Sequence, residues 1–253
     1  MKTFLANILI VISLAATSQE RFTDLDGQKF RIKTLGDGDI TVLFENGMSD
    51  SLEVWQSIPD SVAKFARVFL YDRADIGKSD LSRQERSIPN MVSELKSVLK
   101  KENIKPPYIL VGHSLGGLID RYFASEYPGE VLGMLLLDPS AESYWKSMSK
   151  KELKKYIKGG TEWYESRFKV QYRKEWYQFI PNLNYMNNLK IPKDMPIILL
   201  SAKQLEWSKY QPDIIDGFTN AKLVKLKGDH YTHIAHAELT TNWIKELVER
   251  TGY

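Results

Sequence analysis

The sequence predicts an α/β fold with a mostly parallel sheet of eight strands and helices on both faces. Two observations lead to this prediction. Short apolar runs alternate along the chain with stretches of helical spacing, and several of these runs contain almost no polar residue. Strands that are apolar throughout are typical of parallel sheets buried on both faces. A chain of 253 residues, 43% hydrophobic and 26% charged, is long enough for one such domain with a full core.

The expected elements follow one another in chain order. Residues 22–34 alternate in polarity around an Asp26-Gly27 turn and predict a hairpin of two strands. Six further apolar runs predict strands at residues 39–47, 67–72, 107–112, 131–138, 195–202 and 221–227. Helical spacing of apolar residues predicts helices at residues 51–66, 88–103, 115–128 and 236–250. Strands joined through helices are what the crossover connections of a parallel sheet require.

The first 18 residues predict a secretory signal peptide. Lys2 is followed by an apolar stretch at residues 4–16 and then by small and polar residues, with cleavage expected after Ala16 or Ser18. About 13 apolar residues are too few to span a bilayer. We therefore expect a secreted or periplasmic protein without a transmembrane anchor. The alternative is a buried N-terminal helix.

Composition excludes several kinds of site. The chain has no cysteine, which removes disulfides, thiolate nucleophiles and zinc–thiolate sites. A net charge of +3 is too small to indicate a nucleic-acid partner, and none is expected. His230, His233 and His236 are spaced by three residues, but the third would lie about 240° around a helix from the first. No carboxylate pattern accompanies them, so no metal site is predicted.

Residues 139–195 interrupt the alternation and predict a helical insertion after the sixth strand. This segment holds 11 of the 29 aromatic residues, and its 12 Lys and Arg outnumber its 6 Asp and Glu. It is too aromatic for a disordered linker. We interpret it as a helical lid on the carboxyl edge of the sheet, inserted between core segments 19–138 and 196–253. The alternative is a surface subdomain that only packs.

A serine lies at one junction of strand and helix. Ser114 follows the strand predicted at residues 107–112 and precedes the next helix, within the pattern Gly112-x-Ser114-x-Gly116. In a nucleophile elbow, a serine occupies a strained turn at such a junction so that its hydroxyl stands clear. The turn brings strand and helix close together, so the positions two before and two after the serine must be small. Ser114 is therefore the candidate nucleophile.

A serine hydroxyl needs a base to take its proton, and the chain has four histidines. His230 lies after the last predicted strand and before the closing helix, and it is the candidate base. His233 is the weaker candidate. His113 neighbours the serine on the elbow, where successive side chains point apart, so we interpret it as structural.

A carboxylate must hold the imidazole in the right tautomer and stabilise its charged form. Asp138 ends the strand predicted at residues 131–138, where the sheet determines its geometry, and it is the favoured acid. Glu206, beyond the strand predicted at residues 195–202, is the alternative. A structural role for Asp138, as a cap or turn residue in Asp-Pro-Ser, also stays open.

An oxyanion hole needs two backbone N–H groups aimed at the developing negative charge. Leu115, directly after the candidate nucleophile, would supply one of them. The other is expected from Met48, in the loop that follows the strand predicted at residues 39–47.

From about Phe22 to Val248, the sequence resembles the α/β-hydrolase superfamily. The stretches that carry the resemblance stand in the family's order, and they are VLFENGM, YDRADIGKSD, YILVGHSLGGLIDRYFASEYP, LLLDPS and KGDHYTHI. The resemblance implies a chain order of serine, acid and histidine, a lid that walls the substrate pocket, and hydrolysis through an acyl-serine intermediate without cofactor or metal. The sequence departs from the family pattern at Asn46, where histidine is usual before Gly47, and at Asp75, where glycine is usual. No aspartate follows ILLSA at the usual acid position.

Together these residues predict a serine hydrolase acting on a carboxylic ester, with a small-molecule acyl substrate. Ser114 would attack the acyl carbon, His230 would carry the proton, and Asp138 would orient His230. The same residues could cleave an amide, peptide, lactone or carbon–carbon bond. Two alternatives belong to other classes: a ligand-binding homologue that has lost turnover, and a protein that contacts a membrane surface through its aromatic and basic insertion.

Overall fold

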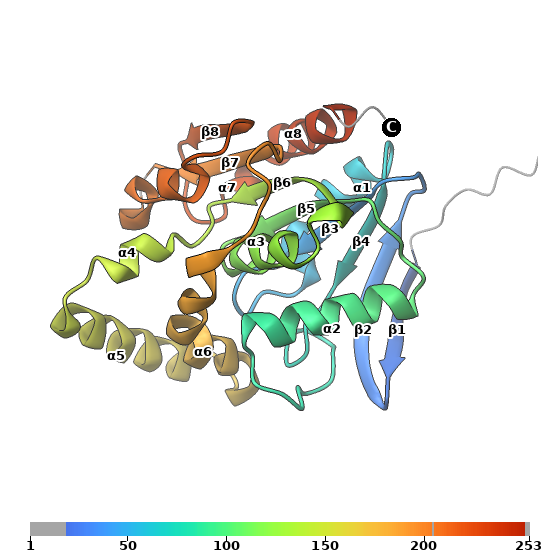
Figure 1. The fold of residues 1–253 in the computed structure, drawn as a ribbon. Helices are drawn as coiled ribbons and strands as arrows, with labels where there is room; N and C mark the ends of the chain where they lie inside the picture. Colours follow the sequence, from blue (N-terminus) through green and yellow to red (C-terminus); the bar gives the residue numbers. More distant parts are fainter. Residues whose placement is uncertain (1–18, 204, 251–253) are drawn as a thin grey trace, which may run out of the picture.

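The computed structural model describes residues 19–203 and 205–250, and its centre is one eight-stranded sheet (Figure 1). The strands are β1 (Gln19–Leu25), β2 (Gln28–Leu35), β3 (Thr41–Glu45), β4 (Arg67–Tyr71), β5 (Tyr108–His113), β6 (Val131–Leu137), β7 (Ile197–Ala202) and β8 (Ala221–Leu226). In space they lie in the order β1-β2-β4-β3-β5-β6-β7-β8. β2 is antiparallel to both β1 and β4, and the pairings from β4 to β8 are parallel. The predicted mostly parallel sheet of eight strands is confirmed.

The antiparallel edge follows from a tight turn. Asp26 and Gly27 have positive φ angles of 52° and 77°, and they join Leu25 to Gln28, which pair across the ladder. Two successive residues with positive φ are what a two-residue hairpin turn of matching twist requires, and Asp-Gly adopts this conformation readily. The hairpin predicted at residues 22–34 is confirmed.

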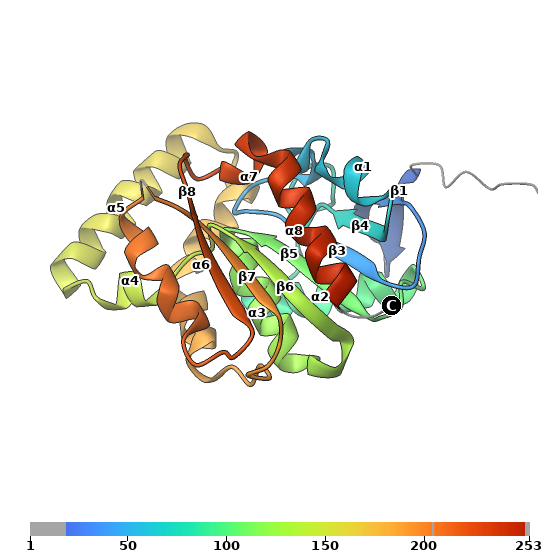
Figure 2. The same ribbon diagram turned by 90° about the horizontal axis from the view of Figure 1, so that it is seen from above.

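Helices cover both faces of the sheet (Figure 2). The helices outside the insertion are α1 (Ile58–Val62), α2 (Ile88–Lys101), α3 (Leu115–Glu126), α7 (Thr232–Ala235) and α8 (Ala237–Arg250). α2 and α3 pack on one face, and α1 and α8 pack on the other. In β5, Leu110 belongs to the first of these two cores, whereas Ile109 and Val111 belong to the second. Because both faces are buried, the strand is a continuous apolar run.

The helix predicted at residues 51–66 is in fact two short elements. A 3-10 turn spans Leu52–Trp55, and α1 begins three residues later. Gln56 between them has a φ of 49°, and Pro59 lies in the first turn of α1. Proline lacks the N–H that would continue a helix from the preceding turn and is favoured at a helix start. The apolar spacing survives, since Leu52, Trp55 and Ile58 are all buried.

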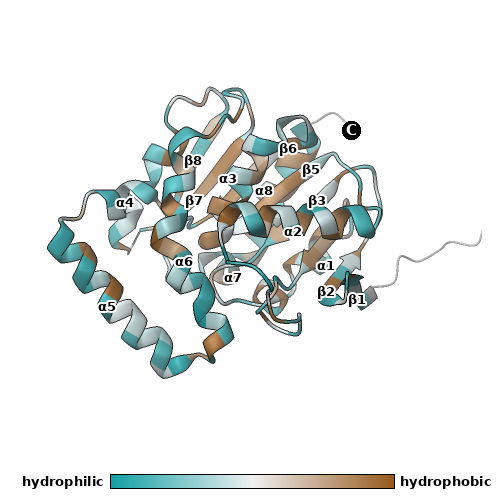
Figure 3. Ribbon diagram, turned by 60° about the horizontal axis from the view of Figure 1, so that its bottom comes forward, coloured by the Kyte–Doolittle hydropathy of each residue, from teal (hydrophilic) through white to brown (hydrophobic). Residues whose placement is uncertain are grey.

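The insertion is helical, as predicted, and it leaves the sheet between β6 and β7. Its elements are α4 (Glu142–Lys146), α5 (Lys150–Arg167), a 3-10 turn (Val170–Arg173), α6 (Lys174–Asn182) and a second 3-10 turn (Leu183–Asn188). α6 buries four of its residues against the rest of the molecule, whereas α5 buries none. Figure 3 shows α5 at the margin of the molecule, apart from the sheet.

The predicted signal peptide at residues 1–18 lies outside the residues that the structure describes. Within residues 19–203 and 205–250, no helix is both long and apolar enough to cross a membrane.

Candidate active site

Ser114 sits on a sharp turn between β5 and α3. Its φ of 53° and ψ of −113° are a conformation that residues other than glycine rarely adopt. A Cβ at Gly112 would lie 2.4 Å from Asp120 Oδ2, and a Cβ at Gly116 would lie 2.2 Å from the carbonyl oxygen of Glu45. Both glycines are therefore required by close packing, and the turn has the geometry of a nucleophile elbow.

Asp138 follows β6, the strand beside the elbow, and it is fully buried. Its Oδ2 lies 2.6 Å from His230 Nδ1. Its Oδ1 accepts hydrogen bonds from the Ala202 N–H at 3.0 Å and from Gln211 Nε2 at 2.8 Å. Since a carboxylate only accepts, Nδ1 carries the proton and Nε2 of His230 is left as the free acceptor.

Glu206, the alternative acid, has a different partner. Its carboxylate accepts a hydrogen bond of 2.8 Å from the Tyr144 hydroxyl, in the insertion, and its side chain is exposed. Of the two candidate acids, the structure therefore brings Asp138, and not Glu206, into contact with His230.

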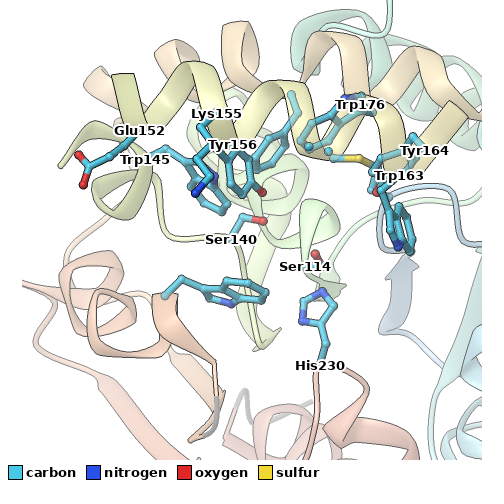
Figure 4. Close-up of a pocket in the computed structure, with 15 residues that line it drawn as sticks. Ser114, Ser140, Trp145, Glu152, Lys155, Tyr156, Trp163, Tyr164, Trp176 and His230 are labelled. Carbon is cyan, nitrogen blue, oxygen red and sulfur yellow. The ribbon is translucent and has the colours of Figure 1, made fainter. Parts of the chain in front are cut away.

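Ser114 and His230 line the same cavity, whose volume is about 630 Å³. In Figure 4 the Ser114 hydroxyl lies next to the His230 ring. Among the contacts of the described residues there is no hydrogen bond between these two side chains, and the His230 side chain keeps 28% exposure. Catalytic hydrogen bonds of this kind are often long before substrate is bound.

The two predicted oxyanion donors are the backbone N–H groups of Leu115, which directly follows Ser114, and of Met48, which lines the same cavity as Ser114. Met48 lines the cavity, and Leu115 is the first residue of α3. The N–H of a first helical residue has no partner inside its helix. Within residues 19–203 and 205–250, neither N–H is paired with an acceptor. Neither N–H is therefore occupied by an acceptor from the described part of the chain, and of the two residues Met48 lines the cavity whereas Leu115 is fully buried.

A comparison with known protein families identifies the fold. The family described as "alpha/beta hydrolase fold" matches residues 40–211, about two thirds of the chain. The chain belongs to the α/β-hydrolase family. The predicted resemblance is thus confirmed at the level of the family.

Three similar proteins cover nearly all of this α/β-hydrolase chain. The uncharacterized protein YqjL of Bacillus subtilis is 27% identical over 245 residues, which cover 88% of this chain and 92% of YqjL. The mouse alpha/beta hydrolase domain-containing protein 10 has a similar fold, with a TM-score of 0.73, 19% identity, and coverage of 92% of this chain and 99% of its own. A marine microorganism esterase has a TM-score of 0.66 and 18% identity, covering 86% and 98% of the two chains.

Asn46 replaces the family's usual histidine and still anchors the loop after β3. It is fully buried, its Nδ2 donates to the Tyr71 carbonyl at 3.0 Å, and its Oδ1 accepts from the Trp55 indole at 2.7 Å. The side chain is satisfied on both sides, so the substitution leaves the loop fixed.

The buried side chain of Arg73 also holds the loop that follows β3. Its guanidinium donates to Glu45 Oε1 at 2.6 Å and to the carbonyls of Asn46 and Gly47 at 2.8 and 2.7 Å. Its Nε donates to Glu175 Oε1 at 2.6 Å. Burial raises the pKa of Glu45, although the Arg73 charge beside it favours the ionised form.

Glu175 connects this loop to the insertion. It lies on α6, is fully buried, and its Oε2 accepts the Ser49 N–H at 2.8 Å. The two neighbours of Met48 in the chain are therefore both held, Gly47 by Arg73 and Ser49 by Glu175. Fixed donors near a reacting centre lower the cost of reorganisation during a reaction.

The other histidines have separate surroundings. His113 donates from Nε2 to the His230 carbonyl at 2.9 Å, and burial lowers its pKa. His233 is fully buried with no hydrogen-bond partner on either ring nitrogen, and burial lowers its pKa to about 2. His236 Nε2 lies 3.0 Å from the Lys227 carbonyl. No group of three or more potential metal ligands occurs among the described residues.

Three residues of this site were missed by sequence reasoning, namely Gln211, Arg73 and Glu175. Arg73 lies in the YDRADIGKSD stretch, so the family pattern draws attention to it. Gln211 and Glu175 have no local signal, because their partners lie 73 and 102 residues away in the chain.

Proposed function

We propose that this protein is a serine hydrolase that cleaves a carboxylic ester through an acyl-serine intermediate. The observation that carries the proposal is the 2.6 Å contact between His230 Nδ1 and buried Asp138, at a cavity that also exposes Ser114. A base oriented by a carboxylate, beside a hydroxyl on a nucleophile elbow, is what serine acyl transfer requires.

In the proposed reaction, His230 Nε2 takes the proton of Ser114 Oγ as that oxygen bonds to the acyl carbon. The N–H groups of Met48 and Leu115 stabilise the negative oxygen of the tetrahedral intermediate. When the ester C–O bond breaks, the leaving alkoxide receives the proton from His230. Water then attacks the acyl group with His230 again as base, which releases the carboxylic acid and restores Ser114. Asp138 stabilises the charged imidazole in both halves.

The insertion supports a lid function within this proposal. Residues of α5 and α6 line the cavity that contains Ser114, so a small-molecule ester would reach the serine between the core (19–138 and 196–253) and the insertion (139–195). We also propose, from the sequence alone, that residues 1–18 are a signal peptide that directs export of the protein.

The test is covalent labelling of the full-length protein with a fluorophosphonate, alongside turnover of 4-nitrophenyl acetate. We expect labelling and turnover in the wild type and loss of both in Ser114→Ala. Ser140→Ala is the matched control, because this second serine lines the same cavity, and it should keep the label.

Two results would contradict the proposal. Labelling that persists in Ser114→Ala would mean that another residue is the nucleophile. A wild-type protein that binds esters without label or turnover would favour a ligand-binding homologue, which is the alternative that fits the missing hydrogen bond between Ser114 and His230.

A further inference from the structure

Aromatic side chains make up nearly half of the residues that line the cavity. Seven of its 15 lining residues are Trp, Tyr or Phe, and six of these seven come from the insertion. Figure 4 shows rings on both sides of the Ser114 hydroxyl, with Trp145 and Tyr156 on one side and Trp163 and Tyr164 on the other. A substrate that reaches the serine must therefore pass between ring faces and edges.

The rings contact one another in a continuous series that ends at His230. Trp207 meets the His230 ring edge-on, with 5.5 Å between the ring centroids, and it stacks on Trp145 with 6.5 Å between the centroids. Trp145 meets Phe179 edge-on at 4.8 Å, and Phe179 stacks on Trp176 at 6.2 Å. Trp145, Trp176 and Phe179 are buried, so these rings are held in place before any ligand binds.

α5 presents one face to the cavity. Its lining residues are Glu152, Lys155, Tyr156, Gly159, Gly160, Trp163 and Tyr164. Their spacing of three and four residues places them on a single helical stripe. Glu152 and Lys155 have opposite charges, and Glu152 is occupied by the capping box with Ser149 at the start of the helix. The charges on this stripe therefore offset each other, and its glycines and rings dominate the contact surface.

The two glycines on this stripe differ in their surroundings. A Cβ at Gly160 would lie 2.0 Å from the Trp176 ring, so Gly160 is explained by the close approach of that ring. A Cβ at Gly159 would meet nothing within 4 Å. Glycine inside a helix is less stable than alanine by about 1 kcal/mol, and packing gives no reason for that cost at Gly159. Gly159 is exposed and is one of the residues that line the cavity.

We propose that the site binds esters that carry a planar aryl group, and that Gly159 provides the space in which this group lies against the aromatic wall. Aromatic pairs contribute beyond their buried area when they stack or meet edge-on. An aliphatic ring of equal size lacks this contribution and is also thicker. The inference deepens the proposed function by naming its substrate class, although the binding part of it does not require turnover.

The experiment uses full-length Ser114→Ala protein, in which a bound ester is not consumed. Its affinity for 2-naphthyl acetate is compared with that for decahydro-2-naphthyl acetate by equilibrium dialysis, because the two esters have the same number of carbon atoms. We expect the aryl ester to bind at least about tenfold more tightly, which corresponds to about 1.4 kcal/mol. Equal affinities would overturn the proposal.

Gly159→Leu in the same background tests the position. We expect it to weaken binding of 2-naphthyl acetate at least about tenfold without lowering the melting temperature, because leucine is the better helix former. Gly159→Ala should give a smaller loss. Gly129→Leu is the matched control, since a Cβ at Gly129 also meets nothing within 4 Å and Gly129 does not line the cavity. Unchanged binding in Gly159→Leu would contradict the assignment of Gly159.

The binding and turnover measurements together distinguish the proposed reaction from the proposed substrate class. Aryl-selective binding in Ser114→Ala, with no ester turnover in the wild type, would leave the substrate class standing and remove the proposed reaction. Turnover in the wild type, with no aryl preference in binding, would keep the reaction and remove the substrate class.

Discussion

The carboxyl edge of the sheet and the insertion hold their side chains in different ways. At the sheet edge, Ser114 and Asp138 each follow a buried strand, and each has a positive φ, 53° and 41°. The Ser114 N–H donates to the Leu137 carbonyl, and the Asp138 N–H donates to the Leu200 carbonyl. In the insertion, α5 has no buried residue and meets the cavity through one stripe of rings and glycines.

The difference separates two tasks. Groups that exchange a proton must keep their geometry to within a fraction of an ångström, and backbone bonds to neighbouring strands provide that precision. A wall that selects a substrate by shape needs space and ring surface instead. The two regions meet at the buried pair of Arg73 and Glu175, which holds the oxyanion loop and α6 together.

The largest expected effect separates the two candidate acids. Asp138→Asn should lower kcat about 10⁴-fold, because the amide no longer fixes the Nδ1–H tautomer of His230. Glu206→Gln should change kcat by no more than about threefold, since the carboxylate contacts Tyr144 and not His230. Ester turnover at saturating substrate measures kcat of both variants. A larger loss of kcat in Glu206→Gln than in Asp138→Asn would make Glu206 the functional acid.

The next effect concerns the junction of the two regions. Glu175→Leu removes one of the two buried carboxylates that pair with Arg73 and leaves the Ser49 N–H without its acceptor. Breaking a buried ion pair in this way costs about 3–5 kcal/mol. Glu162→Gln is the control, because its pair with Lys158 on α5 is exposed and such pairs contribute at most about 0.5 kcal/mol. Urea unfolding measures the free energy of unfolding of both variants. Similar losses would show that the junction does not hold the insertion.

A smaller effect concerns how the free energy of unfolding depends on pH through buried His233. Burial lowers the pKa of His233 to about 2, below the usual 6.5. The unfolded chain takes up this proton below pH 6.5 and the native protein does not, so stability is complete above pH 6.5 and falls as the pH drops below it. Between pH 7 and pH 5, His233 alone should remove about 2 kcal/mol from the free energy of unfolding. His233→Phe should flatten this profile, and an unchanged slope would assign the dependence to other groups.

The smallest effect lies at the start of α5. Ser149 accepts the Glu152 N–H, and Glu152 Oε2 accepts the Ser149 N–H at 2.8 Å. Ser149→Ala should cost about 1 kcal/mol locally. The measurement is amide hydrogen exchange, which should become faster in the first turn of α5 and stay unchanged in β5 and β6. Equal acceleration in the sheet would mean that α5 unfolds together with the core.

Local patterns in the sequence determined much of this protein. The apolar runs predicted the strands, the Asp26-Gly27 pair predicted the hairpin, and Gly112-x-Ser114-x-Gly116 predicted the elbow turn. These features depend on residues within one turn or one strand of each other, so propensity, period and small size are enough to specify them. Apolar spacing alone does not reveal the interruption of the helix between Trp55 and Ile58, although Pro59 is a local signal for a new helix start.

Only the tertiary structure decided which distant groups meet. Asp138 and Glu206 both follow strands of the sheet, and the packing of the loop after β8 is what brings His230 to Asp138, 92 residues away. The ion pair of Arg73 and Glu175 and the open space at Gly159 are equally invisible in the chain. Such contacts depend on how separate elements dock, and any one of many partners of the same chemistry would satisfy the local sequence equally well.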